Sequence, residues 1–229
     1  MGTSSAAASG AGTTGQCSVL LAGGTGLVGR ELLQLLLADP SVVAVHALGR
    51  RELPLHQPRL MQHRVDFAAL PPLPHVDEAF IALGTTIKVA GSQAAFRAVD
   101  LDAVLAVAKA ARAAGATRLG VVSAMGADAQ SRVFYNRVKG EAEAALAALG
   151  FDTLVIARPS LLVGDRHALG QPLRSGEEVG VKVSRWLAPL IPANYRPIAA
   201  AAVARALVRA VRESAGKRVL LSGQMQPQE

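Results

Sequence analysis

Apolar runs and helix-period patterns alternate along most of this chain. Short runs rich in Val, Leu, Ile and Ala, most of them followed by glycine or polar residues, predict strands buried in a parallel sheet. The predicted strands are Val19–Leu21, Val42–Gly49, Met61–Val65, Glu78–Gly84, Arg118–Ser123, Phe151–Ser160 and Arg218–Leu221. Broader apolar faces predict helices that begin at Leu27 and that cover Ser92–Ala114 and Ile198–Val211. The pattern predicts an α/β fold, a doubly wound parallel sheet with helices on both faces.

A glycine cluster follows the first apolar run and opens the first helical pattern. Gly23 or Gly24 allows a tight turn. Gly26 leaves room for a pyrophosphate beside the main chain, and Gly29 allows close packing of helix on strand. We favour a dinucleotide site of the Rossmann type over a glycine-rich turn without a ligand. The predicted cofactor contacts here are Gly23, Thr25, Gly26, Leu27, Val28 and Gly29.

Basic residues end the second predicted strand, where this fold meets the adenosine ribose. An acidic residue there would bind the 2′-hydroxyl of NAD, but the chain has Arg50 and Arg51. Guanidinium groups bind a 2′-phosphate through charge-assisted bonds, so we favour NADP(H) over an exposed basic turn without a ligand. Asp66, after the next strand, either accepts from the adenine amino group or caps a turn.

Two further strand ends contribute candidate site residues. Ligands of open α/β sheets bind beyond the carboxyl ends of the strands, so Leu83, Gly84 and Thr85 are predicted to line the cofactor. The apolar stretch Leu161, Leu162 and Val163 is predicted as a loop that covers a nicotinamide face.

A tyrosine and a lysine lie four residues apart after the fifth strand. On a helix Tyr135 and Lys139 project from one face. An ammonium beside a phenol favours the phenolate, which makes the pair suited to proton transfer at a carbonyl or alcohol oxygen. The alternative is an exposed tyrosine and a solvated lysine.

Composition limits the class of protein. The net charge is +7 but aromatic residues are only 3%, so nucleic-acid binding is disfavoured. No apolar run is long enough to span a membrane, and the histidines show no metal-site spacing. The only cysteine, Cys17, excludes an internal disulfide and favours a cytoplasmic location.

The chain is expected to form a single domain over residues 17–223. We expect a disordered tail at 1–16, which lacks the features of a secretory signal, and a second tail at 224–229. A less regular stretch at about 165–196 is predicted to be a small substrate lid.

Together these features resemble the short-chain dehydrogenase/reductase superfamily, in its atypical branch. The motifs are Gly23-x-x-Gly26-x-x-Gly29, Tyr135-x-x-x-Lys139-Gly140-Glu141, Leu83-Gly84-Thr85-Thr86, Ser123-x-x-Gly126-Ala127-Asp128 and Arg158-Pro159. They are similar to those of the Tat-interacting-protein oxidoreductase-like subgroup. The resemblance implies that Tyr135 donates or accepts a proton and that Lys139 assists it and binds the ribose. It also implies cofactor contacts from Pro159, Leu161, Leu162 and Arg174.

One motif departs from the family pattern. Ser123 is the predicted third catalytic residue, yet the usual hydroxyl lies one or two positions later, where this chain has Ala124 and Met125. The alternative is a strand-end hydroxyl bonded to backbone. The sequence thus predicts an NADP-dependent oxidoreductase for an unidentified carbonyl or alcohol. The alternative is an NADPH-binding regulatory or scaffold protein with a protein partner. Either could be a monomer or a homodimer.

Overall fold

A parallel sheet forms the centre of the molecule. The computed structural model describes residues 16–163 and 192–227, and within these ranges seven parallel strands lie in the order β3-β2-β1-β4-β5-β6-β9. The strands are β1 Cys17–Ala22, β2 Val42–Gly49, β3 Leu60–Arg64, β4 Glu78–Ile81, β5 Arg118–Val122, β6 Thr153–Arg158 and β9 Gly216–Leu221. The order turns back at β1, so the sheet is doubly wound, as predicted.

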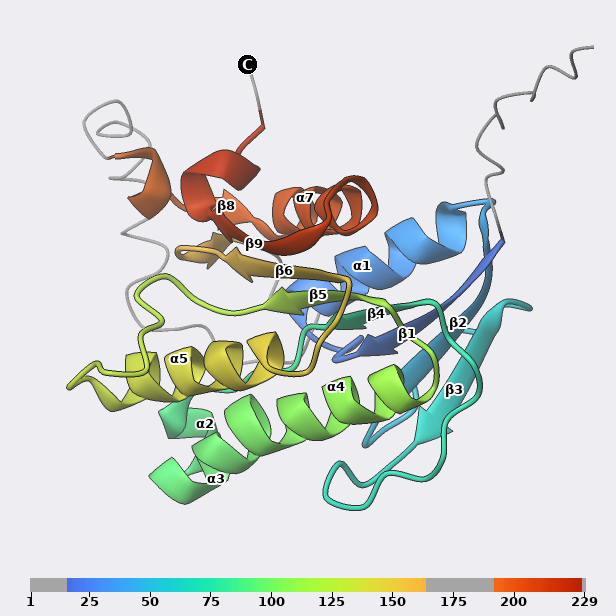
Figure 1. Ribbon diagram of the computed structural model, residues 1–229, viewed down its shortest axis with the longest axis horizontal. Helices are drawn as coiled ribbons and strands as arrows, with labels where there is room; N and C mark the ends of the chain where they lie inside the picture. The colour runs from blue at the N-terminus through green and yellow to red at the C-terminus, as the bar shows by residue number, and fades with distance from the viewer. Residues whose placement is uncertain (1–15, 164–191, 228–229) are drawn as a thin grey trace, which may run out of the picture.

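Helices cover both faces of this sheet (Figure 1). The helices are α1 Leu27–Ala38, α2 Ile87–Ala90, α3 Gln93–Arg97, α4 Val104–Ala113, α5 Phe134–Ala147 and α7 Ala200–Glu213. Helices α1 and α7 lie on one face, and α3, α4 and α5 lie on the other. The predicted α/β fold class is confirmed.

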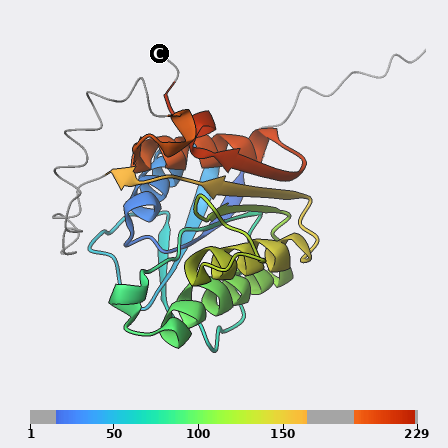
Figure 2. The same cartoon turned by 90° about the vertical axis from the view of Figure 1, so that its left-hand side faces the viewer.

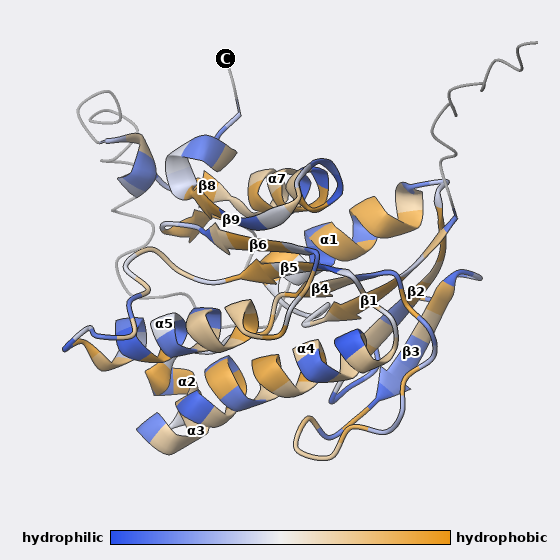
Figure 3. Cartoon of the chain, in the orientation of Figure 1, coloured by the Kyte–Doolittle hydropathy of each residue, from blue (hydrophilic) through white to orange (hydrophobic). Residues whose placement is uncertain are grey.

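Alternate residues of each strand reach opposite cores, as a strand period of two requires. In β1, Val19 and Leu21 pack with α1 and α7, whereas Leu20 and Ala22 pack on the side of α4. All four side chains are buried, so the first strand is apolar on both faces. Figure 3 shows this as mostly orange strands between the helical layers.

Several element boundaries differ from the sequence-based expectation. Strand β4 ends at Ile81, which leaves Leu83 and Gly84 in the loop beyond it. The helix predicted over Ser92–Ala114 is interrupted by a π-helical segment, Ala98–Ala103, between α3 and α4. The predicted apolar loop contains a short strand instead, β7 Leu162–Val163, which pairs with β8 Ile198–Ala199.

The C-terminal tail begins later than predicted. Ser222–Met225 forms a 3₁₀ turn, in which the Gln224 side chain accepts a hydrogen bond from the Leu221 N–H at 2.8 Å. Met225 is only 3% exposed and belongs to the core beside α7. Burial of its side chain explains why residues 224 and 225 are not part of a tail.

An arginine joins α1, β4 and α7 at the amino ends of the strands. Arg212 of α7 forms ion pairs with Asp39, which follows α1, and with the buried Glu78 of β4. Partial burial alone would raise the pKa of Asp39, but hydrogen bonds from Ser41 and Arg212 outweigh it and lower that pKa to about 2. The cluster lies at the edge opposite the predicted site.

Some expectations fall outside the described ranges. These are the tail at residues 1–15, most of the lid predicted at 165–196, and Arg174. Among the helices that the structure describes, none combines the length and hydrophobicity needed to cross a bilayer.

Candidate functional site

The candidate site lies at the carboxyl edge of the sheet, onto which Figure 2 looks. The turn between β1 and α1 is built as its glycines predicted. Gly23 has φ +92°, a left-handed conformation that favours glycine, and a Cβ there would lie 2.5 Å from the Ala82 carbonyl oxygen. A Cβ on Gly29 would lie 2.0 Å from the Gly23 oxygen. These two glycines therefore fix the close approach of the turn to the helix and to the end of β4.

Gly26 differs from Gly23 and Gly29 because a side chain built on it would have free space around it. A Cβ there would find nothing closer than 3.4 Å. Gly26 is the N-cap residue of α1, and its own N–H donates to the Gly23 oxygen at 2.9 Å. No side-chain hydrogen bond caps this helix, and its first turn contains no acidic residue.

The N-terminus of α1 can therefore accept an anion. Its first N–H groups lack helical partners and carry the positive end of the helix dipole. Thr25 is exposed and Leu27 half-buried, but Val28 is packed in the core and could offer only its main chain. The uncapped helix and the open side of Gly26 fit the pyrophosphate of a dinucleotide.

Arg50 and Arg51 follow β2 directly, and both are exposed. Neither guanidinium has a hydrogen bond or an ion pair with the residues that the structure describes. Asp66, after β3, accepts a hydrogen bond from the Ala68 N–H at 3.0 Å through its Oδ1. This hydrogen bond caps the turn, and the contact of Asp66 with adenine stays a prediction.

The predicted tyrosine–lysine pair lies on the first two turns of α5. Tyr135 is half-buried, with its ring centroid 5.4 Å from that of Phe96 in α3. The Lys139 ammonium is buried and contacts the Asp100 carboxylate at 2.7 Å. A Cβ on Gly84 would lie 3.8 Å from the Lys139 nitrogen, so the loop after β4 covers this lysine.

The Ser123 hydroxyl binds the side chain of Glu143, whereas the sequence predicted a bond to a substrate oxygen or to the backbone. Its hydroxyl donates to Glu143 Oε1 at 2.5 Å, and Arg158 binds the same carboxylate from 3.0 Å through Nε and 2.5 Å through Nη2. The hydrogen bond to Glu143 raises the pKa of Arg158, which therefore remains charged. The Ser123 proton points into this buried cluster, which argues against its donation to a substrate oxygen. The predicted alternative, a bond to backbone, is also not what the structure has.

The remaining predicted contacts lie around the end of β6. Pro159 is buried, and its carbonyl oxygen accepts from the Met125 N–H at 3.2 Å. Leu161 is 36% exposed, and its carbonyl oxygen accepts from Ile198 at 2.9 Å, which anchors the start of β7. Leu162 is half-buried beside the core of α1 and α7.

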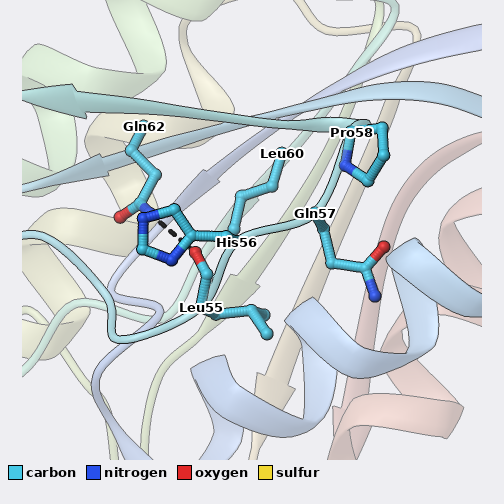
Figure 4. A pocket seen from close by; sticks show the side chains of 6 residues that line it. All are labelled: Leu55, His56, Gln57, Pro58, Leu60 and Gln62. Carbon is cyan, nitrogen blue, oxygen red and sulfur yellow. Dashed lines mark hydrogen bonds between the residues drawn. The ribbon is translucent and has the colours of Figure 1, made fainter.

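A shallow hollow lies away from these residues, on the loop between β2 and β3 (Figure 4). It is lined by Leu55, His56, Gln57, Pro58, Leu60 and Gln62. The Gln62 amide donates to the Leu55 carbonyl at 2.9 Å, which braces the loop. None of the predicted cofactor contacts lines this hollow.

Two histidines meet on neighbouring strands. His46 Nδ1 and His63 Nε2 are 3.0 Å apart, and burial together with His63 lowers the pKa of His46. Spacing along the chain did not predict this pair, because β2 and β3 bring it together. No group of three or more His, Cys, Asp or Glu side chains suited to a metal occurs in the described residues.

Sequence reasoning also missed two buried acids, Asp100 and Glu143. They are 1% and 4% exposed, and each binds a residue that was singled out, Lys139 or Ser123. Neither acid had a local signal. The partners of Glu143, Ser123 and Arg158, come from other elements, and the partner of Asp100 lies on α5.

Comparison with known proteins places the chain in a family. A scan against models of protein families finds no match. Protein HTATIP2 of Rattus norvegicus is 37% identical over 167 residues, which cover 70% of this chain and 67% of that protein. FMP52-1 of Scheffersomyces stipitis is 33% identical over 212 residues, which cover 86% of this chain and 89% of that protein. The chain belongs to the HTATIP2/FMP52 family. The family relationship predicted from the motifs, an atypical short-chain dehydrogenase/reductase, is thereby confirmed.

Solved structures support the fold of this HTATIP2/FMP52 family member. MoeE5 in complex with UDP-glucose and NAD matches with a TM-score of 0.66 and 19% identity, covering 89% of this chain and 75% of MoeE5. A short-chain dehydrogenase family protein from Francisella tularensis matches with a TM-score of 0.65 and 13% identity, covering 91% of this chain and 98% of that protein. At these identities the likeness shows a shared Rossmann-like fold.

The predicted cytoplasmic location is wrong. Relatives in the HTATIP2/FMP52 family are named mitochondrial, among them Protein fmp52 of Emericella nidulans, 37% identical over 66% of this chain and 69% of that protein. A lone cysteine does not identify a compartment, because a reducing environment is common to the cytosol and to other compartments.

Proposed function

We propose that this protein is an NADP-dependent oxidoreductase that acts on a carbonyl or alcohol substrate. One continuous line of contacts supports the proposal. The turn at Gly23 approaches Ala82 and the Leu83 nitrogen, and the same loop then covers Lys139 at Gly84. A dinucleotide whose pyrophosphate lies on α1 would therefore extend across the loop after β4 toward Tyr135 and Lys139.

The proposed chemistry divides the work between cofactor and chain. NADPH, when bound, supplies the hydride for reduction of the carbonyl carbon. Tyr135 donates the proton to the carbonyl oxygen, or accepts it in the reverse direction. Lys139 assists Tyr135 and holds the nicotinamide ribose. The loop after β4 keeps water from Lys139, whose side chain is 8% exposed.

The preference for NADP over NAD is attributed to Arg50 and Arg51. Both are exposed and lack partners among the described residues, so they are available to a 2′-phosphate. NADPH should bind more tightly than NADH, and Arg50→Ala with Arg51→Ala should bring the two affinities close together. Fluorescence titration with each cofactor measures this. Equal affinities in the parent protein would contradict this role for the two arginines.

A second candidate function is NADPH-dependent regulation or scaffolding with little turnover. The hydrogen bond from Ser123 to Glu143 favours it, because this serine is not available as a donor to a substrate oxygen. Under this function, NADPH occupancy controls the binding of a protein partner.

Replacement of Tyr135 by Phe separates the two functions. The enzyme should lose at least about a hundredfold in turnover, because general acid catalysis typically contributes about 10²–10⁴-fold. NADPH affinity should change little, because the anchoring contacts lie at α1. Turnover of carbonyl substrates is followed by NADPH absorbance, and surviving turnover would exclude Tyr135 as the proton donor. Under regulation, capture of the partner should require NADPH and should persist in Tyr135→Phe.

We also propose a mitochondrial location, which the FMP52 names of several relatives support. Cell fractionation with the untagged full chain tests it. Exclusive recovery in the cytosol would contradict it.

A further inference from the structure

Two imidazole rings meet at one side of the sheet, between β2 and its edge strand β3. His46 Nδ1 lies 3.0 Å from His63 Nε2, and the ring centroids are 5.3 Å apart. Within residues 16–163 and 192–227, the other ring is the only hydrogen-bond partner of each imidazole. Both side chains are only partly buried, so the pair is within reach of a small ion from solvent.

The strand register places a methionine beside the pair. In the parallel pairing of β2 with β3, Met61 is the partner of His46, and His63 follows Met61 by two residues. Partners in adjacent strands, and residues two apart in one strand, have side chains on the same face of a sheet. The neighbouring partners Val45 and Leu60 pack on the opposite face, in the core beside α1. Met61 is 43% exposed, so the core does not enclose its thioether.

These three side chains offer two imidazole nitrogens and one sulfur to a metal ion. An ion at the usual ~2.0–2.1 Å from each imidazole nitrogen holds two neighbouring nitrogens about 3–3.5 Å apart. The 3.0 Å between His46 Nδ1 and His63 Nε2 already lies in this range, so an ion could enter with little movement of the rings. The ring that donates the hydrogen bond would carry its proton on its outer nitrogen instead, and both imidazoles would stay neutral.

The ligand set selects a soft ion of low charge. In the part of the chain that the structure describes, no third His, Cys, Asp or Glu joins the pair in a group suited to a metal. The common zinc sites have at least three such ligands, and magnesium, calcium and manganese prefer oxygen. A thioether is a soft ligand that selects Cu(I), and imidazole also suits copper.

We propose that His46, Met61 and His63 form a binding site for Cu(I). The site goes beyond the proposed function, because none of these residues is among the predicted cofactor contacts. A bound ion cross-links the edge strand β3 to β2 through side chains, in addition to the backbone pairing of the two strands.

Cu(I) itself is the probe that tests the proposal. It is added to the full chain without oxygen as its bicinchoninate complex, whose loss of absorbance measures transfer to the protein. The parent protein should take up one equivalent. His46→Gln and His63→Gln should each lower the affinity at least about tenfold, because each removes one ligand. His56→Gln is the matched control, since this histidine is exposed on the loop between β2 and β3 and should bind copper like the parent.

Two further variants identify the sulfur ligand. Met61→Leu removes the thioether at a partly exposed position, so it tests the site even if the histidine variants fail to fold. It should weaken Cu(I) binding about tenfold and remove the sulfur neighbour of copper from the X-ray absorption spectrum. Cys17→Ser removes the only thiol of the chain and should change neither the affinity nor that spectrum.

Four results would overturn the proposal. They are the absence of Cu(I) uptake by the parent protein, an unchanged affinity in either folded histidine variant, loss of the bound equivalent in Cys17→Ser, and a sulfur neighbour of copper that persists in Met61→Leu. NADPH binding is measured separately, so failure of the proposed function would leave this test intact.

Discussion

Gly26 and Gly29 lie three residues apart in one turn but face different surroundings. A methyl group on Gly29 would collide with the Gly23 carbonyl at 2.0 Å, whereas one on Gly26 has at least 3.4 Å of clearance. Gly26 also has φ −83°, which alanine adopts without strain. Gly29 is therefore required by the fold, while the space at Gly26 is available to a ligand.

Alanine substitutions should separate these two roles. Gly26→Ala should keep the melting temperature within a few degrees but weaken NADPH binding at least about tenfold, because the methyl group enters the space of the pyrophosphate. Gly29→Ala should destabilise the fold by several kcal/mol through overpacking against backbone, at or above the usual ~1–3 kcal/mol. Thermal melting and cofactor titration measure both effects. The interpretation fails if Gly26→Ala binds NADPH like the parent protein.

At the residue scale, the sequence indicated features that depend on local spacing better than it indicated buried partners from other elements. The glycine roles and the Tyr135–Lys139 spacing could be read locally, because each depends on neighbours within one turn. Asp100 and Glu143 could not, because a buried carboxylate has a purpose only once another element supplies its cation. For the same reason Ser123 was identified but its partner was not.

Among the elements, α1 and α7 are joined through the charges around Arg212. Asp39 ends α1, and its pKa of about 2 lies below the value of about 3.9 in an unfolded chain. A group whose folded pKa is lowered stabilises the protein fully above its unfolded pKa, and this contribution disappears as the pH falls toward the folded pKa.

Acid unfolding should therefore depend on Asp39. Between about pH 4 and pH 2 the parent protein should lose stability more steeply than Asp39→Asn, which has no charge to lose there. Urea titrations at several pH values measure the difference. Asp152→Asn, an exposed carboxylate after α5, is the matched control and should behave like the parent. Identical pH slopes for the parent and Asp39→Asn would contradict the assignment.

The sequence predicted the bounds of an element well where a single hydrophobic period runs through it. It predicted them poorly where contacts with distant segments determine the local structure. The helix beginning at Leu27 and the strand Val42–Gly49 agree with the structure because their apolar patterns are strong. The π-helical segment Ala98–Ala103 has no local signature that separates it from the helix on either side. The pairing of β7 with β8 joins segments far apart in the chain, so periodicity could not indicate it.

For the whole molecule, cofactor binding should appear as thermal stabilisation. A ligand at 100 times its Kd adds about 2.7 kcal/mol to the stability of the folded state. For a domain of 150–250 residues this corresponds to a rise in Tm of about 5–11 °C. Saturating NADPH should therefore raise the Tm of the 229-residue chain by this amount, as measured by differential scanning fluorimetry. The rise should be smaller for Gly26→Ala at the same concentration, and a parent protein without any rise would not be an NADPH-binding protein.

The π-helical segment has a consequence for length variation among relatives. A hydrogen-bonded turn from residue i to i+5 holds one residue more than an α-helical turn. Deleting one residue from Ala98–Ala103 would restore an ordinary helix with the same register on either side, because the wide turn is what absorbs the extra residue. Phe96 would then keep its place against Tyr135, but the residues inside the segment, Asp100 among them, would be removed or displaced. Single-residue gaps in this segment should therefore mark relatives that have lost the carboxylate–lysine pair.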